Sequence, residues 1–188
     1  MRVIAGEFKG RKLLSPKGRG VRPTTDLVKE AIFSMIAPYL PDAVCLDLFA
    51  GTGALGIEAL SRGAARVYFC DVSPDSTALL RQNLDACRVD GRGAVVYRSD
   101  WRGAVTKLGE KCNLVFIDAP YEMWEYYSQI LETLAAVRVL GTDARIVVER
   151  DADMGGYALP VNFERVREKR YGGIGVDLLA YADRGEEA

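Results

Sequence analysis

The chain has 188 residues, of which 49% are hydrophobic, and a formal net charge of −1. This size and composition fit one α/β domain with a buried core, and no apolar stretch approaches the roughly 20 residues of a membrane-spanning helix. The N-terminus lacks the apolar segment of a secretion signal, so we expect a cytoplasmic protein. The absence of histidine excludes Ser-His-Asp and Cys-His catalysis and most transition-metal sites.

The four cysteines are widely spaced and form no CxxC pair. A zinc or disulfide role would call for paired spacing, so we interpret them as reduced core residues and expect no metal site. They are Cys45, Cys70, Cys87 and Cys112.

Residues 1–30 carry a positive charge that the rest of the chain lacks. Eight Lys or Arg residues face three Asp or Glu residues, a net charge of +5, so the remaining residues sum to −6. This asymmetry favours a polyanionic partner, and a merely solvated segment is the alternative. Two short β-like pieces around Gly6 and Gly10 precede a Gly/Pro-rich loop, so residues 1–24 are interpreted as a basic arm.

From residue 25 the pattern predicts one domain that extends to residue 183, followed by a disordered tail at 184–188. Thr25 and Asp26 can cap a helix that ends by Pro38. Strands at 43–49, 66–72, 94–98, 113–118 and 144–150 then alternate with helices, and Ser73 caps the second of these. Continuous apolar strands alternating with helices indicate a parallel sheet covered on both faces. Residues 163–171 and 175–182 flank Gly172 and Gly173 and should form an antiparallel hairpin.

The segment DLFAGTGALG, residues 47–56, places GxGxxG between a predicted strand and helix. Glycines allow a tight turn close to a ligand, and Asp71, at the end of the next strand, can accept both hydroxyls of a ribose. A tight turn without a ligand is the structural alternative. We therefore predict an adenosine-bearing cofactor, and the candidate binding residues are Asp47, Phe49, Ala50, Gly51, Thr52, Gly53, Asp71 and Val72.

Asp47 bears on the identity of that cofactor. A helix N-terminus in a dinucleotide site faces a pyrophosphate, which this carboxylate would repel. The positive sulfonium and ammonium groups of S-adenosylmethionine would be attracted, so Asp47 favours this cofactor over NAD. Asp100 and Trp101 follow the third strand on the same rim, and we expect their side chains to touch the adenine ring. A loop acid beside a partly buried indole is the alternative.

The fourth strand ends in Asp118-Ala119-Pro120-Tyr121, the candidate catalytic residues. The Asp118 carboxylate and the Ala119 carbonyl are two acceptors, and Tyr121 offers a flat face on which a base could stack. Accepting hydrogen bonds from an exocyclic amine would localise its lone pair as a methyl group arrives. Direct in-line transfer would follow, with the proton lost to Asp118 or to water. Taken alone, the motif is more typical of a turn that ends a strand, and its context favours the base-holding role.

Five segments together resemble a known family: RVIAGEFKGRKL, RPTTD, LDLFAGTGALGIEALSRGA, DAPY and GGIGVDLLAY. Nearly the whole chain resembles the RsmD family of bacterial methyltransferases, which modify guanine N2 in small-subunit (16S) ribosomal RNA. The resemblance implies a Rossmann-like, mostly parallel seven-stranded methyltransferase sheet with a small N-terminal β extension. It also implies S-adenosylmethionine on the loop from Asp47 to Gly53, and the target guanine at Asp118 to Tyr121. The family pattern has proline where this chain has Ala119, which leaves the turn less preorganised.

The resemblance also implies an RNA substrate presented within the small ribosomal subunit or its assembly intermediate, and nothing demands more than a monomer. Basic residues of the arm would then meet phosphates, and the terminal hairpin would extend this track on one face of a strand. The candidate RNA-binding residues are Arg2, Lys9, Arg11, Lys12, Arg19, Arg22, Arg165, Arg167 and Lys169, with Arg170 beside them.

Three rival functions share parts of this pattern. An NAD-linked oxidoreductase shares GxGxxG but gives Asp47 and the DAPY turn no role. A non-catalytic RNA-binding assembly factor would keep the fold but lack methyl transfer, and Ala119 would be the change that removed the activity. An adenine-N6 methyltransferase acting on DNA or RNA would use the same turn, and the residues alone do not separate adenine from guanine.

Overall fold

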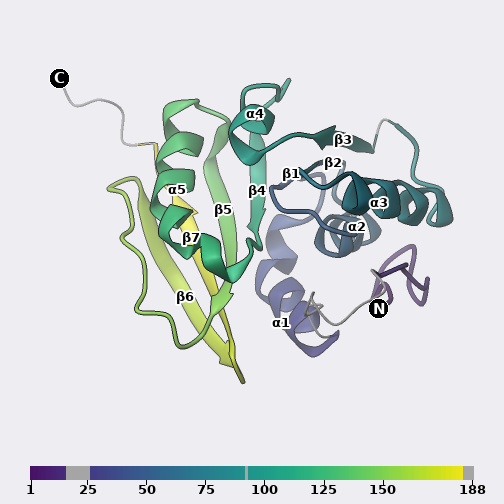
Figure 1. The fold of residues 1–188 in the computed structure, drawn as a ribbon, viewed down its shortest axis with the longest axis horizontal. Helices are drawn as coiled ribbons and strands as arrows, with labels where there is room; N and C mark the ends of the chain where they lie inside the picture. Colours follow the sequence, from purple (N-terminus) through teal and green to yellow (C-terminus); the bar gives the residue numbers. More distant parts are fainter. Residues whose placement is uncertain (16–25, 92, 184–188) are drawn as a thin grey trace.

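The computed structural model describes residues 1–15, 26–91 and 93–183, and a seven-stranded sheet lies at its centre (Figure 1). The first five strands pair in parallel, and the last is antiparallel to both of its neighbours. The strand order β3-β2-β1-β4-β5-β7-β6 joins β1 Val44–Asp47, β2 Arg66–Asp71, β3 Ala94–Arg98, β4 Cys112–Ile117, β5 Leu140–Asp151, β6 Phe163–Tyr171 and β7 Ile174–Tyr181. The predicted mostly parallel sheet with an antiparallel C-terminal hairpin is therefore confirmed.

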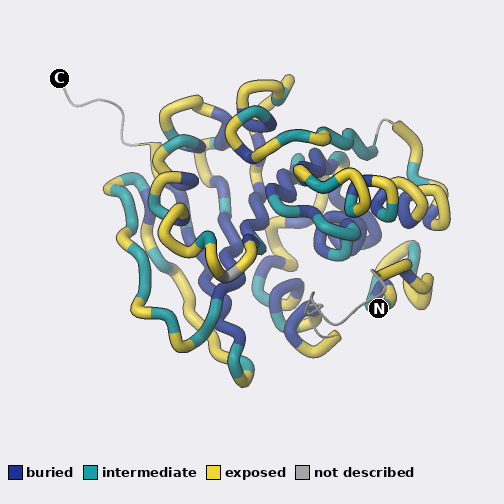
Figure 2. Tube along the Cα trace, in the orientation of Figure 1, coloured by how far each residue is buried: buried dark blue, intermediate teal, exposed yellow. Residues whose placement is uncertain are grey.

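Helices cover both faces of the sheet, and the central strands β1, β2 and β4 bury side chains on both sides. One hydrophobic core lies under α1 (Asp26–Ile36), α2 (Ala54–Ser61) and α3 (Pro74–Ala86), and a second lies under α4 (Trp101–Val105) and α5 (Tyr127–Ala136). Two short 3-10 helices, η1 (Ala37–Tyr39) and η2 (Tyr121–Tyr126), connect these elements. Buried residues follow the central strands in Figure 2, whereas the outer strand β6 is mostly exposed.

Local sequence signals explain most of the element boundaries. Ser73 caps α3 as predicted, since its hydroxyl accepts from the Ser76 N–H at 3.2 Å and Pro74 occupies the first turn. The helix predicted to begin near Asp26 does so and ends at Ile36, before Pro38. The five-residue α4 and the 3-10 helix η2 were not predicted, because neither is long enough to show a helical hydrophobic period.

The arm packs onto the body over residues 1–15. Val3 and Leu13 are buried in the core under α1, α2 and α3, and Arg2 and Lys12 form an isolated antiparallel bridge. The predicted Thr25 cap and the predicted disordered tail at 184–188 lie outside the described residues. All four cysteines are buried and carry no disulfide. Within the described ranges, no helix is both long and apolar enough to cross a membrane.

The terminal hairpin differs from the prediction in one respect. The pairing register of β6 shifts between Arg165 and Arg167, so Arg165 lies opposite Leu179 and Arg167 lies opposite Leu178. Neighbouring residues of β7 point to opposite faces of the sheet, and therefore so do these two arginines. The prediction that Arg165, Arg167 and Lys169 line one face is wrong, because this β-bulge adds a residue between the first two.

Candidate active site

The glycine loop between β1 and α2 is held in a conformation that only glycine adopts readily. Gly51 and Gly53 have φ values of 53° and 82°, and Gly53 forms the N-cap of α2. A Cβ on Gly53 would lie 2.3 Å from Leu80 Cδ1, whereas a Cβ on Gly51 would meet nothing within 4 Å. The loop therefore packs tightly on its inner side and leaves open space at Gly51.

Asp47 ends β1 beneath this loop, and its side chain is 1% exposed. The carboxylate accepts a hydrogen bond from the Gly56 N–H at 3.1 Å. The pKa of Asp47 is raised to about 7, chiefly because the carboxyl is buried; the Gly56 N–H acts to lower it, and the negative charges of Asp118 and Asp71 act to raise it. Three carboxylates therefore lie at the ends of the neighbouring strands β1, β2 and β4, and two of them act on Asp47.

Asp71 ends β2 and ties the glycine loop to the next helix. One carboxylate oxygen accepts from the Gly51 N–H and the other from the Ser73 N–H, both at 2.8 Å. This side chain is partly exposed, and the neighbouring Val72 is 71% exposed. Of the remaining candidate cofactor residues, Phe49 and Thr52 are partly buried and Ala50 is buried.

The turn after β4 places a partly exposed Asp118 beside a buried Ala119, which is 3% exposed. Pro120 has an extended backbone, and its carbonyl accepts from the Met123 N–H at 2.8 Å, which links the turn to η2. Tyr121 begins η2, but its side chain lies outside the described part of the structure. The turn thus leaves β4 in a defined direction, on the rim where the chain also leaves β1.

Asp100 and Trp101 differ from the expectation that both side chains reach a ligand. Asp100 is the N-cap of α4, where its carboxylate accepts from the Gly103 N–H at 2.7 Å. Trp101 is only 3% exposed and belongs to the core under α4 and α5, and the Arg102 guanidinium lies 4.2 Å from the centroid of its ring. The first turn of α4 buries the indole, so little of the Trp101 ring is open to an adenine, and its contact with the cofactor stays a prediction.

The basic residues of the arm are accessible where the structure describes them. Arg2, Lys9, Arg11 and Lys12 are exposed, and Arg2 pairs with Asp26 at 3.1 Å. Arg19 and Arg22 lie outside the described residues.

On β6 the bulge separates the candidate basic residues. Arg167 and Lys169 pair with Leu178 and Val176 of β7, so their side chains point to the side of the sheet on which α1, α2 and α3 lie. Both side chains are exposed there. Arg165 lies on the other face, 3.4 Å from the buried Asp177. Arg170 pairs with Asp153 at 2.9 Å.

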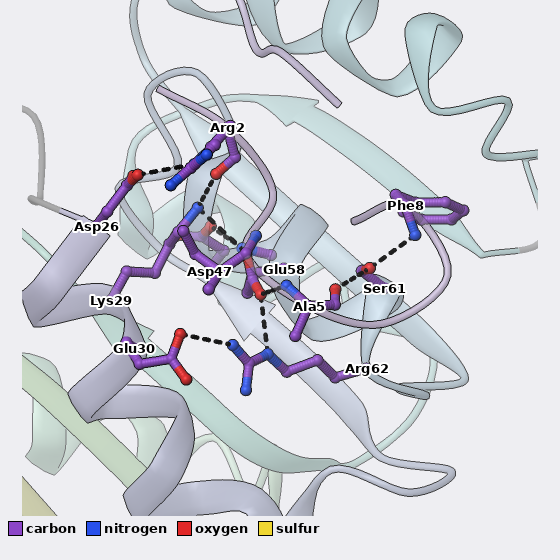
Figure 3. Close-up of polar contacts among 12 residues, drawn as sticks. Arg2, Ala5, Phe8, Asp26, Lys29, Glu30, Asp47, Glu58, Ser61 and Arg62 are labelled. Carbon is purple, nitrogen blue, oxygen red and sulfur yellow. Dashed lines mark hydrogen bonds and ion pairs between the residues drawn. The ribbon is translucent and has the colours of Figure 1, made fainter. Parts of the chain in front are cut away.

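A buried ion pair that sequence reasoning missed holds the arm against α2. Lys29 Nζ lies 3.1 Å from Glu58 Oε2, and both side chains are fully buried (Figure 3). The Glu58 carboxylate also accepts from the Ile4 and Ala5 N–H groups at 2.8 and 3.0 Å. Lys29 therefore belongs to the interior rather than to the basic surface of the arm, although Glu58 on an apolar helix was a visible signal of a buried polar contact.

Asn83 on α3 forms a second contact of this kind. Its fully buried amide accepts from the Leu14 N–H at 2.7 Å and donates to the Leu14 and Thr52 carbonyls at 3.1 and 2.9 Å. One side chain thus joins the end of the described arm to the glycine loop. Nothing in the local sequence distinguishes this asparagine from a solvated residue of an amphipathic helix.

The fold and this rim define a Rossmann-like methyltransferase. A solved structure described as a putative methyltransferase, yhhF from Escherichia coli, matches with a TM-score of 0.86 and 35% identity, over 97% of this chain and 98% of that one. The chain belongs to the family described as conserved hypothetical protein 95, which matches residues 1–180.

Two curated relatives support the same membership. Ribosomal RNA small subunit methyltransferase D of Escherichia coli strain K12 is 36% identical over 186 residues, 99% of this chain and 92% of its own. A putative rRNA methyltransferase, YlbH of Bacillus subtilis, is 37% identical over 188 residues, 98% of this chain and 100% of its own. The resemblance to the RsmD family is confirmed.

Proposed function

We propose that this protein transfers a methyl group from S-adenosylmethionine to the exocyclic N2 amine of a guanine in small-subunit (16S) ribosomal RNA. The observation that carries this proposal is that Asp47, Asp71 and Asp118 lie at the ends of three neighbouring parallel strands beside the glycine loop, where Asp71 accepts from the Gly51 N–H. Relatives named as small-subunit ribosomal RNA methyltransferases support the substrate class.

The cofactor side of the rim fits a cationic adenosine compound. A buried carboxylate whose pKa is about 7 is stabilised in its charged form by a nearby cation and is destabilised by a pyrophosphate. Asp47, the loop 49–53 and Asp71 with Val72 would hold S-adenosylmethionine, with the ribose at Asp71 and with space for it above Gly51. When bound, the sulfonium compound supplies an electrophilic methyl group. The backbone near Asp100 would border the adenine, beside the largely buried Trp101 ring.

On the base side, the Asp118 carboxylate and the Ala119 carbonyl would accept hydrogen bonds from the guanine amine, and Pro120 and Tyr121 would complete the base-holding turn. These acceptors orient the amine and localise its lone pair toward the methyl group. No general base of the histidine type is needed, because the proton can leave to Asp118 or to water after transfer.

The RNA would meet a basic surface formed by the arm, residues 1–24, while the domain at 25–183 carries out the transfer. Arg2, Lys9, Arg11 and Lys12 are exposed there, and Arg167 and Lys169 extend the surface on the same face of the sheet. Phosphate contacts of this kind position RNA and weaken steeply with salt. We place the reaction in the bacterial cytoplasm, on the small subunit or its assembly intermediate, with the protein acting as a monomer.

Methyl transfer to small-subunit particles tests this proposal. Tritiated S-adenosylmethionine is incubated with the protein and with particles from cells that lack the modification, and the labelled RNA is digested to nucleosides. Label in N2-methylguanosine is the expected result. Label in N6-methyladenosine would instead identify an adenine enzyme. No label at any salt concentration, with RNA binding retained, would identify a non-catalytic assembly factor.

A further inference from the structure

A pocket that the proposed reaction does not use opens at the end of β5. Its volume is about 270 Å³, and its lining residues are Trp124, Tyr127, Asp151, Asp153 and Met154. This volume falls just below the range of pockets that hold drug-sized molecules, about 300–1,000 Å³, so it suits a single flat ring system.

The pocket lies on the same rim of the sheet as Asp118. β4 and β5 are parallel neighbours in which Ile117 pairs with Val148, so both strands end on one side. Asp118 follows directly after β4, and Asp151 ends β5. The Tyr127 hydroxyl donates to the Glu149 carbonyl at 3.2 Å and holds the start of α5 against β5. The base-holding turn and the pocket are therefore adjacent.

Trp124 supplies the pocket with an aromatic wall that is open to solvent. It is 42% exposed, although a tryptophan gains much by burial. Its position is set by the backbone, because η2 follows the Asp118 turn directly and the Tyr127 N–H donates to the Trp124 carbonyl. An exposed indole at this position offers a flat surface on which an unstacked base can lie.

The polar side of the pocket consists of hydrogen-bond acceptors. Asp151 Oδ1 accepts from the Asp153 N–H at 2.8 Å, which fixes the turn after β5. Asp153 pairs with Arg170 at 2.9 Å. Ionised carboxylates only accept hydrogen bonds, so the pocket attracts rings that carry N–H donors and repels phosphate.

We propose that this pocket binds the base of a nucleotide adjoining the methylated guanine, and that it selects a base with an exocyclic amine. Trp124 stacks on that base, and Asp151 accepts from its amine. Adenine, cytosine and guanine have such an amine, whereas the Watson–Crick edge of uracil offers a single donor, N3–H, between two carbonyls, so one of these carbonyls would face the carboxylate. This inference rests on the proposed function, because a target base extruded to Asp118 leaves its neighbour unstacked.

The first test compares two aromatic residues of η2. Trp124 and Tyr126 are both 42% exposed, but only Trp124 lines the pocket. Steady-state methylation of unmodified particles should show a KM raised about 5- to 150-fold in Trp124→Ala, which corresponds to the stacking of one base. Tyr126→Ala should change KM less than twofold. Both variants should keep kcat, the melting temperature and the calorimetric affinity for S-adenosylmethionine.

The second test asks which base the pocket selects. Particles are prepared with uridine substituted in turn at each nucleotide flanking the methylated guanine. The wild-type KM should rise severalfold for one flanking position, and Asp151→Asn should reduce this discrimination, because the amide can also donate to a uracil carbonyl. The substitution keeps an oxygen for the Asp153 N–H, so the turn after β5 is preserved.

Two results would contradict the proposed role of the pocket while leaving the proposed function intact. One is an active wild type with Trp124→Ala and Tyr126→Ala indistinguishable in KM. The other is a Trp124→Ala variant that loses kcat at constant KM, which would place the target base itself in the pocket. A wild type that transfers no methyl group to any particle would remove both the function and the inference.

Discussion

The two halves of the active-site rim hold their functional groups in different ways. On the cofactor half, Asp47 and Asp71 receive three backbone N–H groups between them, and Asp47 is buried. On the base half, Asp118 is partly exposed and Trp124 is 42% exposed. A small cofactor of constant shape favours rigid preorganisation, whereas a base that arrives on a large RNA needs an open approach. Changes to the first half should therefore affect stability and cofactor affinity, and changes to the second should affect RNA binding or turnover without loss of stability.

The largest effect on stability is expected at the buried ion pair of Lys29 and Glu58, the latter on the helix α2 that follows the glycine loop. Glu58→Ala leaves the Lys29 ammonium buried without its partner and leaves the Ile4 and Ala5 N–H groups unsatisfied. Loss of one partner of a buried pair costs about 3–5 kcal/mol in free energy of unfolding, which urea denaturation measures. Glu30→Ala is the control, because Glu30 is half exposed and 3.8 Å from Arg62. Equal losses in both variants would contradict the role of the buried pair.

Within the base half, Asp118 should affect turnover, whereas Trp124 should affect KM. Asp118→Ala removes an acceptor for the target amine and should lower kcat about a hundredfold to a thousandfold, as loss of one transition-state hydrogen bond does elsewhere. Affinity for S-adenosylmethionine should hold or rise slightly, because Asp118 raises the pKa of Asp47 and its removal favours the charged form of Asp47. Single-turnover transfer and calorimetry measure the two quantities. A variant that loses cofactor affinity in proportion to kcat would show that the halves are not separate.

The packing of α2 on β2 provides a smaller test of the cofactor half. A Cβ on Gly56 would lie 2.2 Å from Phe69 Cε1 and 2.9 Å from Val67 Cγ1, so Gly56→Ala must displace the helix from the strand. We expect a loss of about 1–3 kcal/mol in unfolding free energy and a weaker cofactor affinity. Gly91→Ala is the matched control, because its Cβ meets nothing within 4 Å. A Gly56→Ala variant as stable as the control would argue against close contact here.

The smallest effect is a pH dependence of cofactor affinity. The pKa of Asp47, raised to about 7 by burial, should fall when a cation binds, so the ionised carboxylate is the form that binds. Affinity for S-adenosylmethionine should therefore decline by up to about tenfold per unit as the pH falls from 7 toward 5.5. Asp47→Asn should bind more weakly and show no such slope. Parallel slopes for the two proteins in calorimetry would assign the titration to another group.

Much of the cofactor half could be predicted from local sequence, because its determinants are local. The Gly51 and Gly53 turn needs positive φ, Ser73 caps a helix next to Pro74, and parallel strands end on a common rim. Spacing alone therefore places Asp47 and Asp71 near the same loop. On the base half, the DAPY turn was visible in the sequence, but the pocket was not, because it combines η2 with a turn after β5 from a distant part of the chain.

The amino-acid sequence by itself determined the order of strands and helices, the glycine loop and the antiparallel hairpin, since each depends on hydrophobic period and on backbone preferences of neighbouring residues. Only the tertiary structure decided that Trp101 is buried, that Lys29 pairs with Glu58, and that a bulge separates Arg165 from Arg167. These features depend on contacts between residues far apart in the chain, or on one extra residue in a strand. The hydrophobic period of the sequence reveals neither of these.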